Sequence, residues 1–337
     1  MSYTNGLDKP SDYFTTKLFT GNGGTNAITG VGFQPDWIWF KNRTSAQSHA
    51  IVDSVRGREG LQSNVDEADY TLNSGKDFGT FDSDGFTVLT PQQLNSFNYN
   101  TGSIVSWNWV AGTSFTNDAS GTGIGSIDSA GSASDASGFS ICSYTGTGSN
   151  ATVKHGLSTT PSMIIHKRRD DASGWPTWHT SLGTSIMELN ETGAVQSGSS
   201  YTNGTAPTSS VFSIGTSGDI NADGGTFIAY CFAEKQGYSK FSNYKGNAST
   251  NGTFVHTGFK PAFVMVKKSA GTGSWAMQDN KRTPFNVQKK SLFANLSDAE
   301  TDSANDAVDF LSNGFKFKSD TANYNTDGDA YIYMAFA

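Results

Sequence analysis

The side chains best suited to metal binding or acid–base chemistry in this sequence are its five histidines. They are His49, His155, His166, His179 and His256. No two of them have the i, i+4 or His-x-His spacing that, with a carboxylate, places imidazoles on one metal ion. His155 and His256 both precede a Gly…Pro turn, which favours a structural role. The sequence therefore predicts no metal site and no cofactor.

Carboxylates offer a second kind of chemistry, that of the paired acids in a glycoside hydrolase. Asp53 and Asp279 are candidates to act with Glu59 or Glu300. Nothing in the spacing fixes the distance between such partners, and each of the three related segments described below lacks one or both of them. We therefore expect a protein without catalytic residues, and a glycan depolymerase is kept as an alternative.

Three tryptophans are candidates for binding rather than catalysis. Trp175, Trp178 and Trp275 lie in irregular segments between predicted strands, where exposed aromatic rings would be found. Aromatic rings with nearby Asn or Asp can stack on sugars, so these residues are candidate glycan or receptor contacts. The alternative is that the rings close the edge of a β-sandwich, since Trp contributes a large apolar surface to a core.

All these residues belong to a threefold internal repeat. Each copy has a Gly, a turn that ends in Pro, an apolar strand, and a Lys as the sixth residue after the Pro. This opening motif occupies residues 32–41, 156–167 and 258–267 in the three copies. Pro suits the first residue of a strand, because its missing N–H breaks no ladder hydrogen bond. Apolar residues on both faces predict a central strand that is covered on both sides.

Further landmarks follow in the same order in each copy, at nearly constant spacing. A second strand precedes a shared Asn, and a long aromatic strand closes the repeat. The shared asparagines and the closing aromatics are Asn64, Asn190 and Asn295, and Trp109, Phe232 and Phe336. Short strands and dense turn signals predict an all-β protein made of three tandem antiparallel β-sandwich repeats, of jelly-roll or concanavalin-like type.

The repeat also predicts the domain boundaries. Residues 1–17 form an N-terminal lead, 18–112 the first repeat, 138–234 the second and 235–337 the third. Residues 113–137 consist almost entirely of Ser, Gly, Ala, Asp, Thr and Asn, which is typical of a flexible linker.

Composition and charge narrow the classes of partner. The net charge is −7 and no basic stripe is present, so we expect no nucleic-acid binding. No apolar stretch approaches the roughly 18 residues that span a membrane. The N-terminus lacks the basic and apolar regions of a signal peptide, so we expect synthesis and folding in the cytoplasm. Cys142 and Cys231 lie in apolar strands and are expected to be buried free thiols.

The repeat motif resembles a family of proteins encoded by tailed phages, many of them from viruses of marine bacteria and cyanobacteria. The resemblance rests on residues 19–23, 29–43, 237–241, 252–261 and 331–336, and it extends over nearly the whole chain. Such proteins are usually described as uncharacterised virion or tail-fibre-like proteins, sometimes likened to concanavalin-type sandwiches. The resemblance implies a virion component and carries no catalytic residues.

These observations favour a non-enzymatic virion structural protein, either a tail fibre or a host-receptor-binding appendage. A decoration or cement protein on the phage head is the alternative, and a carbohydrate-binding module or a depolymerase is a further one. Expected partners are other virion proteins, a host surface glycan or receptor, and copies of the chain itself, with a trimer favoured. The loops in which the copies differ, 44–60, 168–186 and 268–291, are the predicted contact regions.

Overall fold

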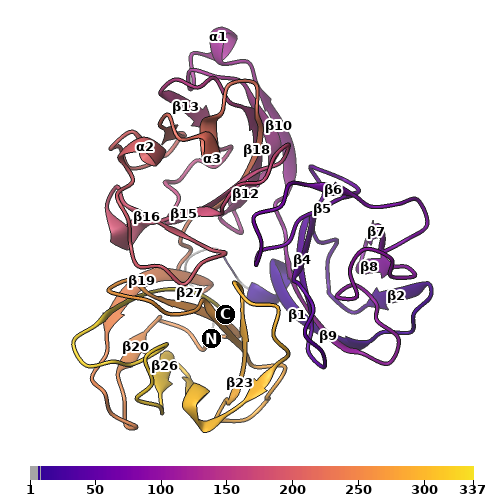
Figure 1. Ribbon diagram of the computed structural model, residues 1–337, viewed down its shortest axis with the longest axis vertical. Helices are drawn as coiled ribbons and strands as arrows, with labels where there is room; N and C mark the ends of the chain where they lie inside the picture. The colour runs from indigo at the N-terminus through magenta and orange to yellow at the C-terminus, as the bar shows by residue number, and fades with distance from the viewer. Residues whose placement is uncertain (1–6, 8) are drawn as a thin grey trace.

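The computed structural model describes residues 7 and 9–337 and confirms an all-β sandwich fold. Residues 1–6 and 8 of the predicted N-terminal lead lie outside the described part of the chain. Figure 1 shows three lobes that follow one another along the chain and surround a common centre. We call them unit 1 (residues 14–109), unit 2 (113–232) and unit 3 (239–336).

Unit 1 packs a larger four-stranded sheet against a smaller three-stranded one. In sheet order, the larger sheet contains β1 (Phe14–Thr20), β9 (Ser103–Trp109), β3 (Trp37–Asn42) and β4 (Ala50–Asp53). The smaller sheet contains β2 (Asn26–Thr29), β8 (Gly85–Val88) and β7 (Phe78–Asp82), and a separate pair is formed by β5 (Glu59–Gly60) and β6 (Tyr70–Thr71). Because β1 begins at Phe14, the predicted boundary between residues 17 and 18 falls inside a strand.

Unit 2 has a larger sheet of seven strands and a smaller sheet of two. In order, the larger sheet contains β10 (Thr113–Asn117), β11 (Ser129–Ser134), β12 (Phe139–Thr145), β18 (Thr226–Phe232), β14 (Met163–Arg168), β15 (Pro176–His179) and β16 (Ile186–Glu188). The smaller sheet pairs β13 (Ala151–Lys154) with β17 (Val211–Ile214). Short helices connect these strands: α1 (Ala119–Thr122), η2 (Thr180–Leu182), α2 (Ser199–Thr202) and α3 (Gly218–Asn221).

Unit 3 has a larger sheet of six strands and a smaller sheet of three. In order, the larger sheet contains β19 (Ser239–Lys245), β27 (Ala330–Phe336), β21 (Phe263–Lys268), β22 (Ala276–Asp279), β23 (Lys290–Phe293) and β24 (Thr301–Asp302). The smaller sheet contains β20 (Phe254–His256), β26 (Gly314–Phe317) and β25 (Val308–Leu311). One 3-10 helix, η1 (Pro10–Asp12), precedes unit 1, and another, η3 (Ala304–Asp306), lies within unit 3.

The three larger sheets share one antiparallel strand order. The closing strand of each unit lies between the opening strand and the strand that follows the Gly…Pro turn, as in β1-β9-β3, β12-β18-β14 and β19-β27-β21. The glycines of these turns, Gly32, Gly156 and Gly258, have φ values of +94°, +83° and +87°. Residues with a Cβ rarely adopt such φ values, which explains why Gly recurs in the motif.

Two kinds of hydrophobic core result from this arrangement. Each unit has its own core between its two sheets. A further core lies at the common centre, where the other face of each larger sheet meets the other two. Trp109, Phe232 and Phe336 form a triangle there, with ring centroids 6.4, 5.7 and 6.1 Å apart. These closing aromatics therefore mark an axis around which the units are arranged.

The strand after each Pro is buried on both faces, as its apolar pattern predicts. The second residues after the Pro are Trp37, Met163 and Phe263. Each is 1% exposed and belongs to the central core. The sequence of one unit could not show this, because the surface that covers these residues is supplied by the other two units.

Residues 113–137 are not a flexible linker. They form β10, α1 and β11, and β11 pairs with β12 over its full length. Small hydroxyl-bearing residues do not prevent strand formation where a neighbouring strand satisfies the backbone. Gly131 is required by this pairing, because a Cβ at that position would lie 1.8 Å from the carbonyl oxygen of Ile141. The hairpin thereby adds two strands to the larger sheet of unit 2, on the outer side of β12.

Candidate functional site

The Lys that ends each Gly…Pro strand is buried at a boundary between two units. Lys41 of unit 1 donates to the carbonyl oxygen of Ser297 in unit 3, at 2.8 Å. Lys167 of unit 2 donates to the backbone carbonyl oxygen of Asp66 in unit 1, at 2.9 Å. The equivalent lysine of unit 3, Lys267, completes the contacts between the three units.

Lys267 of unit 3 donates to the backbone carbonyl oxygens of Thr192 and Gly193 in unit 2, at 3.0 and 2.7 Å. The three ammonium groups thus link the units in one rotational direction. All three lysines are 0% exposed. Burial lowers the pKa of each from 10.5 to about 8, because the surrounding carbonyls only partly replace the lost hydration.

Backbone hydrogen bonds follow the same rotation. The N–H groups of Gln47, Ser173 and Gly273 donate to the carbonyls of Ser297, Asp66 and Thr192, respectively. Backbone hydrogen bonds also cross each boundary in the opposite direction. In these bonds the N–H groups of Glu300, Asp69 and Val195 donate to the carbonyls of Arg43, Arg169 and Ser269, respectively. Parts of the variable loops 44–60, 168–186 and 268–291 are therefore used for contacts between units, and only the remainder can meet an external partner.

The predicted glycan-contacting tryptophans are buried, so that prediction is wrong. Trp175, Trp178 and Trp275 are 0%, 4% and 2% exposed. Trp175 donates its indole N–H to the carbonyl of Val65 in unit 1 at 3.0 Å, and Trp275 donates to Glu188 in unit 2 at 2.9 Å. Trp178 lies in the core of unit 2 and donates to Gly183 at 2.7 Å. The alternative interpretation, rings that close a packed edge, describes their environment.

His49 occupies in unit 1 the position that Trp175 and Trp275 hold in units 2 and 3, since the backbone N–H of each donates to the shared Asn. Its Nδ1 accepts from the indole N–H of Trp39 at 2.7 Å, and its Nε2 lies 2.9 Å from the carbonyl oxygen of Phe293 in unit 3. These partners fix a neutral ring with its proton on Nε2. Burial, with the positive charge of Lys41 nearby, lowers the pKa of His49 well below its usual value.

Three of the four candidate catalytic carboxylates, Asp53, Asp279 and Glu300, are held in ion pairs. Asp53 pairs with Arg56 at 2.6 Å and accepts from the hydroxyl of Tyr230 in unit 2 at 2.7 Å. Asp279 pairs with Arg282 at 2.6 Å in the same way.

Trp107 of unit 1 donates to Asp279 at 3.1 Å, so this carboxylate also joins two units. Glu300 of unit 3 forms a bidentate pair with Arg43 of unit 1, with both contacts at 2.8 Å. Glu59 accepts from Thr71 at 3.0 Å. Asp53, Asp279 and Glu300 thus serve the boundaries between units.

Three of the remaining histidines are also held by internal partners, whereas His256 is exposed. His155, His166 and His179 are buried, and burial lowers their pKa values to about 4, 3 and 4. Within the described residues no group of three or more His, Cys, Asp or Glu is placed to hold a metal ion. Cys142 and Cys231 are buried free thiols, as predicted. Over the same residues, no helix has the length and apolar character needed to cross a membrane.

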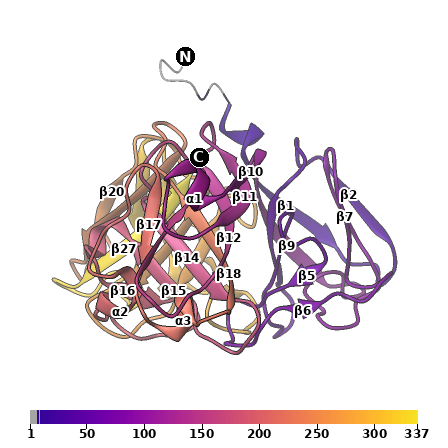
Figure 2. The same cartoon turned by 90° about the horizontal axis from the view of Figure 1, so that it is seen from above.

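An open groove lies on unit 2, and we call it the hairpin groove. It has a volume of about 840 Å³ and is lined by residues of β10, β11, β12 and β18, with Arg169 following β14. Figures 1 and 2 place β10 and β12 on the side of unit 2 toward unit 1. The groove exists because the β10–β11 hairpin extends the sheet beyond the width seen in units 1 and 3.

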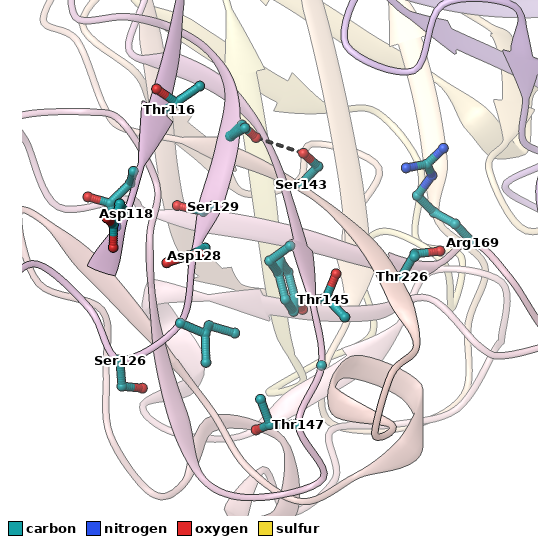
Figure 3. Close-up of a pocket in the computed structure, with 15 residues that line it drawn as sticks. Thr116, Asp118, Ser126, Asp128, Ser129, Ser143, Thr145, Thr147, Arg169 and Thr226 are labelled. Carbon is teal, nitrogen blue, oxygen red and sulfur yellow. Dashed lines mark hydrogen bonds between the residues drawn. The ribbon is translucent and has the colours of Figure 1, made fainter. Parts of the chain in front are cut away.

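The floor of the hairpin groove is the same sheet face that forms the central core. Along β12 this face carries Phe139 and Ile141 in the core, then Ser143 and Thr145 in the groove. Thr226 lies directly across from Thr145 in the register of β12 and β18. Figure 3 shows Thr226 and Arg169 on one side of Thr145, and Asp118 and Asp128 on the other. One face of the sheet thus changes from apolar to polar as it leaves the axis.

These residues were missed by sequence reasoning. The hairpin was interpreted as a linker from its composition, and Thr145 and Thr226 carry no motif. The available signal was the alternation along β12, in which the residues of one face change from Phe and Ile to Ser and Thr.

The fold and the boundary contacts define a protein of three β-sandwich units closed into a ring. The chain belongs to the family described as "Domain of unknown function (DUF7483)", which matches residues 9–337. No curated protein matches the chain. Among solved structures, "Crystal structure of the major capsid protein P2 from Bacteriophage PM2" is 11% identical, with 59% of this chain and 98% of that chain covered and a TM-score of 0.18. At that score the likeness carries no argument about fold or function.

Proposed function

We propose that this protein is a non-enzymatic structural component of a tailed-phage virion, located at the tail as a host-binding appendage. The observation that carries the proposal is the ring of three units around one axis. Virion assemblies are built on rotational symmetry, and a rotationally repeated surface can meet several equivalent partners at once. The resemblance of the repeat motif to phage tail-fibre-like proteins supports the same class.

The use of reactive side chains within the ring supports a role without catalysis. Asp53, Asp279 and Glu300, the strongest candidates for acid chemistry, are each paired with an arginine. A hydrolase of the two-carboxylate type needs both acids open to the glycosidic bond. Carboxylates that hold units together are not available for that task.

The positions of the first and last described strands support attachment along the axis. Phe14 at the start of β1 stacks on Phe336 at the end of β27, with ring centroids 5.2 Å apart. The first and last described strands therefore meet near the axis, and Figure 1 marks the C-terminus close to the centre of the ring. A virion partner seated on the axis would contact both strands.

A head decoration protein is the second candidate, and one observation favours it. A single chain already has threefold pseudosymmetry, so one copy can cover a threefold position on a capsid without assembling a trimer. The homotrimer favoured by the sequence stays a prediction. Its mass relative to the 35.9 kDa of one chain, measured by light scattering, tests it.

The copy number of the protein in purified particles separates these candidates. Quantitative mass spectrometry, normalised to the major capsid protein, would give a few copies in multiples of three or six for a tail appendage. Hundreds of copies per particle would instead support decoration of the head. Gold-labelled antibodies viewed by electron microscopy provide the location independently. If the protein is absent from purified particles, both proposals fail.

A further inference from the structure

We propose that the hairpin groove of unit 2 binds a neutral oligosaccharide. The inference rests on the proposed function, because it supplies the host-binding site that an appendage requires and that the buried tryptophans cannot provide. It assigns the site to residues between β10 and β18.

The groove presents hydroxyl groups that the protein itself does not use. Thr116, Thr145 and Thr226 are exposed, and their hydroxyls make no hydrogen bond within residues 7 and 9–337. Each hydroxyl can both donate and accept. Sugar hydroxyls need partners of both kinds, so such a row matches the hydrogen-bonding pattern of a polyhydroxylated ligand.

Two carboxylates, Asp118 and Asp128, lie beside these hydroxyls in the lining of the groove. Oδ1 of Asp118 accepts from the hydroxyl of Ser120 and the N–H of Gly121, and Oδ1 of Asp128 accepts from the N–H of Ala119. The Oδ2 atom of each makes no hydrogen bond in the part of the chain that the structure describes. Carboxylate oxygens form short, charge-assisted bonds with hydroxyl donors. Asp118 and Asp128 can therefore each accept from a sugar hydroxyl.

The charges in the groove favour a neutral ligand over an acidic one. Arg169 is the basic residue of the lining, and its guanidinium is paired with Asp69 of unit 1 at 2.7 Å. With that cation neutralised, Asp118 and Asp128 set the local potential. Like charges repel, so uronic or sialic acids would be disfavoured in this position.

The lining also argues against a peptide or an apolar small molecule. Protein interfaces are centred on large apolar or aromatic anchors and have few charges in the core. Among the described residues that line the groove, Tyr144 is the aromatic one, and it is 5% exposed because its ring packs in the core of unit 2. Ile127 and Ala130 add a limited apolar surface between the polar rows. The volume of about 840 Å³ lies within the roughly 300–1,000 Å³ of known ligand sites.

The test is to probe the purified full chain with an array of neutral hexose and N-acetylhexosamine oligosaccharides, printed beside acidic glycans that carry uronic or sialic acid. We expect binding to neutral members, and calorimetry with the best of them gives the affinity. Binding to acidic glycans alone, or to no glycan, would overturn the proposal.

Variants then locate the site. The double substitution Thr145→Val and Thr226→Val keeps the β-branched shape and removes two hydroxyls, and should weaken binding by at least about tenfold. Thr116→Trp fills the groove from its edge strand and should abolish binding. The matched control is Thr20→Val, because Thr20 is the exposed residue of β1 that corresponds to Thr145, and it should leave the affinity unchanged. Circular dichroism confirms that each variant is folded.

The outcomes separate this inference from the proposed function. If the double valine variant and Thr116→Trp both bind like the unsubstituted protein, the hairpin groove is not the site, whatever the location of the protein in particles. If neutral glycans bind at the groove but the protein is absent from purified virions, the site stands and the virion role fails.

Discussion

Single buried residues carry the contacts between units, and the Lys at the end of each Gly…Pro strand is the clearest example. Lys41 and Lys167 give the carbonyls of Ser297 and Asp66 a second donor beside a backbone N–H, and Lys267 is the donor to the carbonyl of Gly193. A buried carbonyl without a donor costs the free energy of its desolvation. We infer that this Lys recurs in all three copies because each boundary needs the same cationic donor.

We expect Lys267→Met to lower the free energy of unfolding by roughly 1–3 kcal/mol, because the unbranched chain still fills the space but leaves the carbonyl of Gly193 without its donor and that of Thr192 with the N–H of Gly273 alone. Urea denaturation of the variant measures this change. Lys245→Met is the matched control, since Lys245 is an exposed lysine of the same unit. Equal stabilities of the two variants would contradict the role of Lys267.

The neutral state of His49 gives a prediction about pH. The pKa of His49 is lowered in the folded state, so the unfolded chain binds a proton at this position as the pH falls below about 6.5, while the folded chain does not. Stability supplied by the neutral ring is therefore present above pH 6.5 and is lost progressively on acidification. His49→Trp introduces the residue that units 2 and 3 have at this position and removes the titrating group.

We expect the unfolding free energy of the His49→Trp variant to fall less steeply between pH 6.5 and 5, by about 1.4 kcal/mol per pH unit at the limit of one proton. Chemical denaturation at several pH values measures both slopes. The slope is informative even if the larger ring changes the absolute stability. Parallel slopes for the two proteins would show that His49 titrates equally when folded and unfolded.

At the scale of elements, the β10–β11 hairpin distinguishes unit 2 from the others. Its pairing with β12 brings Gly131 against the backbone of Ile141, where a Cβ would lie at 1.8 Å. Gly131→Val should therefore separate the hairpin from the sheet and raise amide hydrogen exchange over 113–134 by at least about tenfold.

The neighbouring substitution Ala130→Val is the control for that experiment. Ala130 faces the hairpin groove, and a β-branched residue suits a strand, so exchange there should stay near that of the unsubstituted protein. If Gly131→Val leaves the hairpin protected, the close approach of the two strands is not a constraint on this residue.

The elements show where sequence reasoning succeeds and where it cannot. The strand that begins after Pro35 was predicted correctly, because the Gly, the Pro and the apolar run are local signals. The hairpin was missed because the partner that orders it, β12, is not visible in a composition of Ser, Thr and Gly. Trp175 and Trp275 are candidates for exposed rings in the sequence, and their burial cannot be read there because their hydrogen-bond acceptors belong to a different unit, far away in the sequence. A sequence pattern that describes one unit therefore cannot predict the contacts between units.

At the scale of the whole molecule, the central core makes the three units depend on one another. Trp109, Phe232 and Phe336 come from different units and contact one another at the axis. Opening any one unit would expose the apolar faces of the other two, at about 25 cal/mol per Å² of apolar surface. The ring therefore has no unit that can unfold without a large cost to its neighbours.

This dependence predicts that the chain unfolds in a single transition rather than three. Calorimetry of the unsubstituted protein should give one unfolding peak. Phe232→Ala should lower the free energy of unfolding by about 3–5 kcal/mol, because a large buried ring is lost. The midpoint temperature should fall while the peak stays single. Hydrogen exchange should then rise in β9 and β27 as well as in β18, although only unit 2 carries the substitution. Phe285→Ala is the control, because this side chain is 79% exposed and should change neither quantity. If Phe232→Ala destabilised β18 alone, the units would be independent domains on a shared chain, and the axial surface on which the virion proposal depends would have no common stability.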